Sequence, residues 1–349
     1  MNLRIPSYVL VSLLAAYLTY LLIPVVRDLC IKKGFLDQPG PRKIHKVPIP
    51  RLGGVAFIFA FIFSISVGLI VDQTSWKDNW LGIMGTFMGG LLIFILGLID
   101  DLKNIKPLVK LFWQAVAALI PVLYGLKIEV INLPYYGLIE LGFWGIPISV
   151  VWVMMITNTF NFLDGLDGLA SGIGAISALT FLVLGIVLDL PLATLFAAGI
   201  LGLTLSFLRY NFYPAKIFMG DSGSLFIGFI LGVLSLHWPK SYATLVMFIP
   251  ILALGVPLVE IITTTLRRIF TGKKFYMADR RHLFHFLLDL GVPHRGVVLI
   301  FYAISLQFSI MAVGLVAGKA NIVLVLEGLF IILIAIYLSR QVLAGGNNG

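Results

Sequence analysis

Charged residues are scarce in this chain of 349 residues: 12% are Asp, Glu, Lys or Arg, whereas 60% are hydrophobic. About a quarter of the residues in a typical soluble domain are charged, so the composition excludes an ordinary soluble protein and predicts an integral membrane protein. Cysteine occurs once, as Cys30, which excludes an internal disulfide. Histidine is also rare, with five residues in the chain, and any grouping of histidines is therefore informative.

Long apolar runs take the place of the missing charge. A helix needs about 20 residues to cross about 30 Å of hydrocarbon, and these runs are continuously apolar instead of alternating, which favours helices over a closed β-barrel. We expect an all-α polytopic membrane protein, with residues 1–349 forming a single integral membrane domain and segment 127–143 forming a small hairpin. We predict about eleven transmembrane helices, near residues 6–26, 53–71, 81–99, 111–126, 144–160, 168–188, 191–208, 223–238, 243–266, 297–317 and 320–339.

The basic residues orient these spans. Of the 25 lysines and arginines, all but Arg4, Lys77, Lys127, Lys240 and Lys319 fall in alternate intervals between the spans. The positive-inside rule then places the N-terminus outside and the C-terminus in the cytoplasm. The same basic face would attract anionic lipid headgroups, and no nucleic-acid-binding motif is visible. The predicted cytoplasmic loops are 27–52, 100–110, 161–167, 209–222 and 267–296.

Aspartates lie at the predicted cytoplasmic ends of three spans. Asp100 and Asp101 end "IFILGLIDDLK", Asp164 and Asp167 lie in "NTFNFLDGLDGLASG", and Asp221 lies in "IFMGDSGSLFIG". Simple structural explanations exist, because Asp221 could cap a helix and Asp-Gly pairs favour turns. An acid pair at a helix C-terminus is electrostatically unfavourable, however, and three acidic groups on one face indicate a shared site.

The residue types suggest a site for a hard cation and phosphate. Magnesium is typically held by one or two carboxylates together with substrate phosphates, and a further carboxylate could act as a base. Neutral hydrogen bonds could come from Asn158, Asn161 and Asn211, and phosphate oxygens could be neutralised by Arg267, Arg268 and Arg281. Loop 267–296 also holds His282, His285 and His294, and loop 27–52 holds His45. The segment "DRRHLFH" could alternatively be a helix lying on the membrane surface.

Five blocks carry a resemblance to a known family: "RKIHKVPIPRLGG", "DDLKNIKPLVKLFWQ", "NTFNFLDGLDGLASG", "LRYNFYPAKIFMGDSGSLFIG" and "RRIFTGKKFYMADRRHLFHFLLDLG". With these, the chain resembles the polyprenyl-phosphate N-acetylhexosamine-1-phosphate transferases (glycosyltransferase family 4, of the MraY, WecA and TagO type), and in particular the undecaprenyl-phosphate GlcNAc-1-phosphate transferases. The resemblance implies a multi-pass enzyme of the bacterial cytoplasmic (inner) membrane. It would transfer N-acetylglucosamine 1-phosphate from UDP-GlcNAc to undecaprenyl or another polyprenyl phosphate, releasing UMP and initiating cell-envelope polysaccharide synthesis. Its cofactor would be Mg²⁺, with Mn²⁺ as an alternative.

The resemblance also implies roles for individual residues. Asp221 would be the main metal ligand, with Asp100 and Asp101 as further ligands that activate or position the lipid phosphate. Phe218 would stack on uracil, with Asn211 beside it. The catalytic set is Asp100, Asp101, Lys110, Asp164 and His282. The substrate-binding set is Lys46, Asn158, Asn161, Gly165, Leu166, Asp167, Asn211, Phe218, Arg267, Arg268, Arg281 and His285.

Two other functions compete with this interpretation. The first is phospho-N-acetylmuramoyl-pentapeptide transferase, but the Asp-Arg-x-His-x-x-His frame that ends at His285 resembles the GlcNAc branch. Phe284 is a departure, because that branch usually has His-Ile-His-His here. The second is an anion transporter, which would carry coupling charges near the bilayer midplane, whereas the acids here lie at one face. The sequence leaves open whether the chain forms a homodimer.

Overall fold

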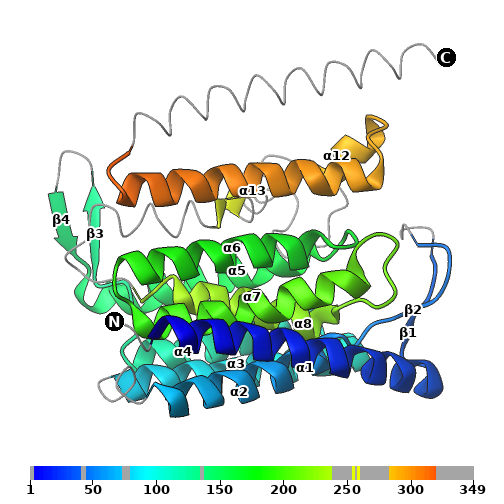
Figure 1. The fold of residues 1–349 in the computed structure, drawn as a ribbon, viewed down its shortest axis with the longest axis horizontal. Coiled ribbons are helices and arrows are strands. Elements are labelled where there is room, and N and C mark those ends of the chain that lie inside the picture. The colour runs from blue at the N-terminus through cyan, green and yellow to red at the C-terminus, as the bar shows by residue number, and fades with distance from the viewer. Residues whose placement is uncertain are drawn as a thin grey trace.

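The computed structural model describes residues 4–40, 45–72, 79–133, 137–237, 254–255, 258–259 and 283–319. Within these ranges the protein is a bundle of helices lying side by side, with a small hairpin at each end (Figure 1). The helices are α1 (Arg4–Lys33), α2 (Gly54–Val71), α3 (Trp80–Lys103), α4 (Pro107–Leu123), α5 (Gly145–Leu163), α6 (Leu169–Val187), α7 (Pro191–Asn211), α8 (Gly220–Leu234), α12 (Leu283–Asp289) and α13 (His294–Val316).

The described helices confirm an all-α polytopic membrane protein. Seven of them are long and apolar enough to cross a bilayer, and two shorter apolar helices, α4 and α8, accompany them. A described helix lies at each predicted span except those near 243–266 and 320–339. Those two fall outside the described residues, apart from 254–255 and 258–259.

Helix α1 continues beyond the apolar run predicted near residues 6–26 and into the predicted loop 27–52. The polar sequence that follows the apolar run continues the helix to Lys33. The helix ends before Gly34, whose φ of +74° is in the left-handed region that favours glycine, and Phe35 N–H donates to Cys30 O at 2.9 Å. The predicted loop therefore begins with about two turns of helix. It contains strands β1 (Leu36–Asp37) and β2 (Ile49–Pro50), which pair antiparallel.

The opposite end of the bundle carries the predicted hairpin of segment 127–143. Strand β3 (Val130–Leu133) pairs antiparallel with β4 (Gly137–Glu140), and Val130 lies opposite Glu140 in the register. Figure 1 shows this hairpin and the β1–β2 hairpin at opposite ends of the bundle, with α12 at the β1–β2 end.

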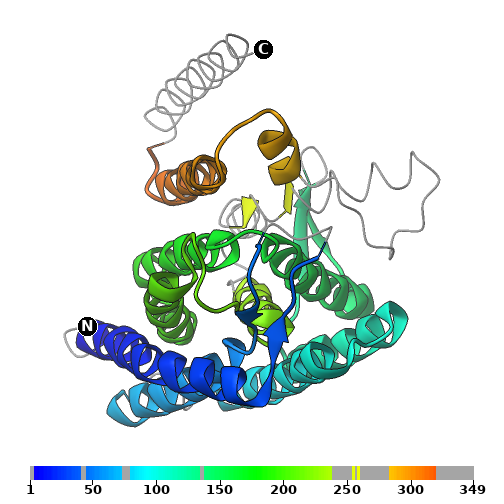
Figure 2. The ribbon, with the colours of Figure 1, turned by 90° about the vertical axis from the view of Figure 1, so that its right-hand side faces the viewer.

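Helix α8 forms the centre of the bundle (Figure 2). Every residue from Ser222 to Leu234 is buried, as expected for a helix that is hydrophobic on all sides. It packs against α2, α3, α4, α5, α6 and α7. Two glycines allow the backbones to touch: a Cβ on Gly97 of α3 would lie 2.6 Å from Ser222 Cα, and one on Gly54 of α2 would lie 2.6 Å from Gly223 Cα. The start of α8 is thereby held against the end of α3.

Candidate active site

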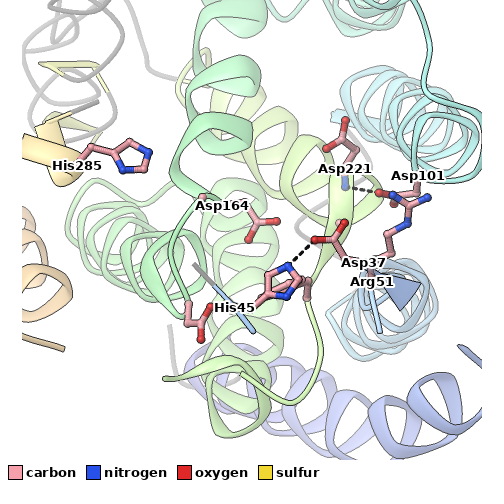
Figure 3. Close-up of a pocket in the computed structure, with 11 residues that line it drawn as sticks. Asp37, His45, Arg51, Asp101, Asp164, Asp221 and His285 are labelled. Atoms are coloured by element: carbon pink, nitrogen blue, oxygen red, sulfur yellow. Dashed lines mark hydrogen bonds and ion pairs between the residues drawn. The ribbon is translucent and has the colours of Figure 1, made fainter. Parts of the chain in front are cut away.

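A cavity of about 340 Å³ lies at the end of the bundle that carries the β1–β2 hairpin. Figure 3 shows Asp164 between His285 on one side and Asp37, Arg51, Asp101 and Asp221 on the other. The cavity is lined by Asp37, His45, Arg51, Asp101, Asp164, Gly165, Asp167, Phe218, Gly220, Asp221 and His285. All three predicted acidic groups thus contribute to one pocket.

Four helices bring a polar cluster together beside this cavity. Lys110 of α4 places its Nζ 2.8 Å from Asp100 Oδ2 at the end of α3, and the same ammonium pairs with Asp221 Oδ2 at the start of α8. Asn161 of α5 donates from Nδ2 to Asp221 Oδ1 at 2.8 Å and to Ser224 Oγ at 3.0 Å. The two carboxylates therefore share one cation, and both oxygens of Asp221 have partners that are side chains.

Asp101 has a different task from its neighbour Asp100. Its Oδ1 accepts the backbone N–H of Asp221 at 2.8 Å, and its Oδ2 accepts the backbone N–H and the hydroxyl of Ser222 at 3.0 and 2.7 Å. These bonds satisfy backbone N–H groups at the N-terminus of α8, which have no hydrogen-bond partner within the helix itself. Asp101 is 6% exposed. A metal bound by Asp101 would have to compete with these three hydrogen bonds.

The cap by Asp101 answers the question of whether Asp221 is itself a helix cap. Asp221 lies in the first turn of α8, and no side chain caps from the Ncap position, Met219. The amides are instead satisfied from α3, and the Asp221 carboxylate points to Lys110 and Asn161. The carboxylate of Asp221 is therefore not occupied by helix capping and is available for chemistry.

Asp164 is affected both by burial and by the other carboxylates. It follows the last residue of α5 and is partly buried. Burial raises the pKa of its carboxyl well above the usual value, and the negative charges of Asp221, Asp101 and Asp167 raise it further. Ionised Asp164 is thus unfavourable in this pocket unless a cation lies nearby.

The Asp167–Gly168 turn is fastened from three sides. Asp167 Oδ2 accepts the N–H of Ala215 at 2.9 Å. Asn211 Oδ1 accepts the N–H of Gly168 at 3.0 Å, and Tyr302 of α13 donates to Gly168 O at 2.5 Å. Gly168 has a φ of +82°. The turn is therefore held in place by α7, α13 and the segment before α8.

Two asparagines predicted to touch substrate lie away from the cavity. Asn211 is 1% exposed and also donates to Ile217 O at 3.1 Å. Asn158 exchanges hydrogen bonds with Gln114 of α4, at 2.7 and 3.2 Å. In this arrangement both side chains hold helices together. Leu166 is likewise buried, at 3% exposure. Their contacts with substrate stay predictions.

The β1–β2 hairpin contributes three lining residues to which the sequence assigned no role. His45 faces Asp37 Oδ2 with Nε2 and Val47 O with Nδ1, each at 2.8 Å, and its ring meets Phe218 edge-on, with centroids 5.4 Å apart. Arg51 follows β2. The available signal was the motif "RKIHKVPIPRLGG", from which only Lys46 was chosen, and Lys46 is exposed and does not line the cavity.

The final cytoplasmic loop is described only in part. His285 lies on α12 and lines the cavity, as its predicted role requires. The predicted residues Arg267, Arg268, Arg281 and His282 lie outside the described residues.

The donor set is suited to a magnesium ion whose coordination shell is completed by oxygens of the substrate. The described residues hold no cluster of three or more His, Cys, Asp or Glu arranged to bind a metal by themselves. Asp100 and Asp221 do meet at one cation, the Lys110 ammonium, and Asn161 adds an amide there. Magnesium usually takes one or two carboxylates and fills its remaining positions with water and phosphate oxygens. Asp100 and Asp221 fit that pattern.

The fold and the pocket define a multi-pass membrane protein with an aspartate-rich site where helix ends meet water. The family model described as "Glycosyl transferase family 4" matches residues 83–239. The chain is 36% identical over 341 residues to a probable undecaprenyl-phosphate N-acetylglucosaminyl 1-phosphate transferase of Bacillus subtilis, covering 96% of this chain and 92% of that protein.

Two further relatives are similar over most of the chain. A decaprenyl-phosphate N-acetylglucosaminephosphotransferase of Mycobacterium tuberculosis is 33% identical, covering 84% of this chain and 78% of its own. An undecaprenyl-phosphate alpha-N-acetylglucosaminyl 1-phosphate transferase of Thermotoga maritima is 30% identical, covering 85% and 87%. The protein belongs to glycosyl transferase family 4, in the superfamily of polyprenyl-phosphate hexosamine-1-phosphate transferases.

Proposed function

We propose that this protein transfers N-acetylglucosamine 1-phosphate from UDP-N-acetylglucosamine to a polyprenyl phosphate and releases UMP. The observation that carries the proposal is the convergence of Asp100, Lys110, Asn161 and Asp221 from four helices beside an aspartate-lined cavity. A lipid acceptor reaches such a site from the membrane and a nucleotide reaches it from water. The names of the three relatives support the same reaction.

The transfer makes one bond and breaks one. An oxygen of the lipid phosphate attacks the β-phosphorus of the donor, and the bond from that phosphorus to the bridging oxygen breaks, so that UMP leaves with the electron pair. Phosphoryl transfer depends chiefly on positioning and on stabilising charge. Lys110, held between Asp100 and Asp221, is placed to neutralise phosphate oxygens.

Little base catalysis is required of the protein. A phosphate monoester has a second pKa of about 6 and is largely ionised at neutral pH, so the attacking oxygen carries its charge already. Asp100 orients Lys110 and can accept the remaining proton. Mg²⁺, or Mn²⁺ in its place, would be held by Asp221 and Asp100 and would supply charge neutralisation on the diphosphate.

We further propose that the cavity faces the cytoplasm of a bacterium and that the protein crosses the cytoplasmic membrane eleven times, with its N-terminus outside. In support, the β1–β2 hairpin and α12, which belong to predicted cytoplasmic loops, lie at the same end of the bundle. The β3–β4 hairpin, predicted to be outside, lies at the other end.

The test uses purified protein with magnesium, undecaprenyl phosphate and a panel of UDP-sugars, with UMP release as the readout. We expect UDP-N-acetylglucosamine to give UMP and a lipid-linked sugar, and UDP-N-acetylmuramoyl-pentapeptide to give neither. A site with hydrogen bonds for one sugar discriminates strongly against others. Transfer from the pentapeptide donor alone would assign the muramoyl reaction instead. Loss of UMP release on removing undecaprenyl phosphate is the control for simple hydrolysis.

A further inference from the structure

Arg51 is the one lysine or arginine among the described residues that line the cavity, where it lies with five aspartates. Its Nε is buried and has no hydrogen-bond partner in the described structure. Lys110, by contrast, already forms ion pairs with Asp100 and Asp221. Figure 3 shows the Arg51 side chain in the group that includes Asp37 and Asp101, yet the guanidinium forms no ion pair with a described carboxylate.

The backbone around Arg51 is fixed relative to Phe218 and Asp221. Pro50 O accepts the N–H of Phe218 at 2.8 Å, Gly53 N–H donates to Phe218 O at 3.0 Å, and Gly54 N–H donates to Met219 O at 2.8 Å. Arg51 therefore lies inside a short ladder that joins the hairpin to the segment preceding α8. A backbone fixed in this way gives the Arg51 side chain a rigid support beside the cavity.

Glycine at position 220 brings Arg51 close to the start of α8. Gly220 has a φ of +70°, and a Cβ there would press on Arg51 O and would lie 2.6 Å from an Asp101 oxygen. The Arg51 backbone thus touches the residue that precedes Asp221. At its other end the hairpin is held by the contact of His45 with Asp37.

An anionic ligand needs positive charge to enter a pocket of aspartates. The diphosphate of a nucleoside diphosphate would be repelled by the ionised carboxylates of the pocket, and a guanidinium presents several N–H donors in a fork that matches phosphate oxygens. A guanidinium that has no ion pair within the described part of the chain supplies that charge beside Phe218, Gly165 and Asp167.

We infer that Arg51 binds the diphosphate of the nucleoside diphosphate donor, as a phosphate ligand supplied by the N-terminal hairpin. The inference rests on the proposed function, because it names the part of the donor that Arg51 contacts. The lipid phosphate is the other source of the same chemistry. Lys110, Asn161 and Asp100, which could contact that phosphate, lie outside the set of residues that line the cavity.

The test compares the binding of UDP and of uridine to the full-length protein in detergent with magnesium. We expect Arg51→Gln to weaken UDP binding on the order of 10- to 100-fold, the range for hydrogen bonds to a charged group, and to leave uridine binding unchanged. Arg51→Lys keeps the positive charge but lacks the forked donors of the guanidinium. Its affinity for UDP should fall between those of wild type and Arg51→Gln. Arg209→Gln is the matched control, because Arg209 is exposed and lies over the ring of Tyr20, 5.3 Å from its centroid.

Steady-state kinetics separate the two phosphates. Arg51→Gln should raise KM for the UDP-sugar and leave KM for polyprenyl phosphate unchanged. Unchanged UDP affinity, an equal loss of UDP and uridine affinity, a shift confined to the lipid KM, or a wild-type protein that does not bind UDP would each overturn the inference. Arg51-dependent UDP binding in a wild-type protein that transfers no sugar phosphate would support Arg51 as the ligand and refute the proposed reaction.

Discussion

The carboxylate of Asp101 accepts the backbone N–H of Asp221 at 2.8 Å, across 120 residues of sequence. An acid at the end of α3 therefore caps the helix whose first turn contains another acid of the same site. Asp101 has a structural role in this arrangement, and Asp221 is left to face Lys110 and Asn161. Substitutions at the two positions should consequently have different effects.

Asp101→Ala should lower the stability of the protein more than Asp221→Ala does. It removes three hydrogen bonds at the start of α8, and loss of an N-cap costs about 1–2 kcal/mol. Thermal unfolding of both variants in detergent measures the difference. Asp101→Asn, which retains one acceptor oxygen, should lie between wild type and Asp101→Ala. Equal melting temperatures for Asp101→Ala and Asp221→Ala would contradict the capping role.

Asp221→Asn should abolish UMP release while leaving the unfolding temperature of the metal-free protein near that of wild type. Its carboxylate does not cap α8, so the helix keeps its first turn. Added magnesium should raise the unfolding temperature of wild type, because a ligand that binds only the folded state stabilises it, and should do so less for the variant. An equal magnesium effect in both proteins would place the metal elsewhere.

Asp164→Asn should stabilise the metal-free protein at neutral pH. Burial and the neighbouring acids raise the pKa of Asp164 above its unfolded value of about 4. Its favourable contribution is therefore complete below that unfolded pKa and is lost as the pH rises toward the folded pKa. Unfolding temperatures measured in EDTA should coincide for wild type and Asp164→Asn near pH 4 and diverge above it, with the variant higher. Parallel curves would contradict the shift.

Gly97→Ala should reduce both stability and activity, because a Cβ at this position would lie 2.6 Å from Ser222 Cα and 2.7 Å from the carbonyl carbon of Asp221. Backbone atoms cannot move aside as a side chain can, so α8 would shift. Gly90→Ala on the same helix is the matched control, since its Cβ would make ordinary contacts at 3.4 Å with Ile230 and Phe226. Melting temperature and UMP release together report both effects. Full activity of Gly97→Ala would show that the contact can relax.

Most of the helical architecture could be predicted because each membrane-spanning helix corresponds to one apolar run in the sequence. The hairpin of β3 and β4 was predictable from local alternation around a glycine. The extension of α1 to Lys33 was not, because polar residues beyond the apolar run fit both a loop and a helix that continues into water. The choice between these depends on tertiary contacts and on where a left-handed glycine falls.

The acids of the site could be found from sequence, whereas their separate tasks could not. Asp100 and Asp101 are adjacent, and successive side chains on a helix point about 100° apart, so one meets Lys110 and the other meets α8. Only the packed structure determines which is which. Arg51 was counted among the residues that orient the protein in the membrane. Its unpaired Nε becomes visible only when the side chains around it are placed.

The long sequence separation between Asp101 and Asp221 also bears on how the protein is made. The ribosome must add 120 residues after Asp101 before its partner exists, and α8, buried among six other helices, cannot be enclosed until those helices have entered the bilayer. During that interval Asp101 lacks the hydrogen-bond donors that α8 supplies. The site is therefore completed only when α8 joins the helices that were inserted before it. A delay in the insertion of α8 would leave the nascent chain with the acids of α3 unpartnered and with the centre of the bundle unfilled.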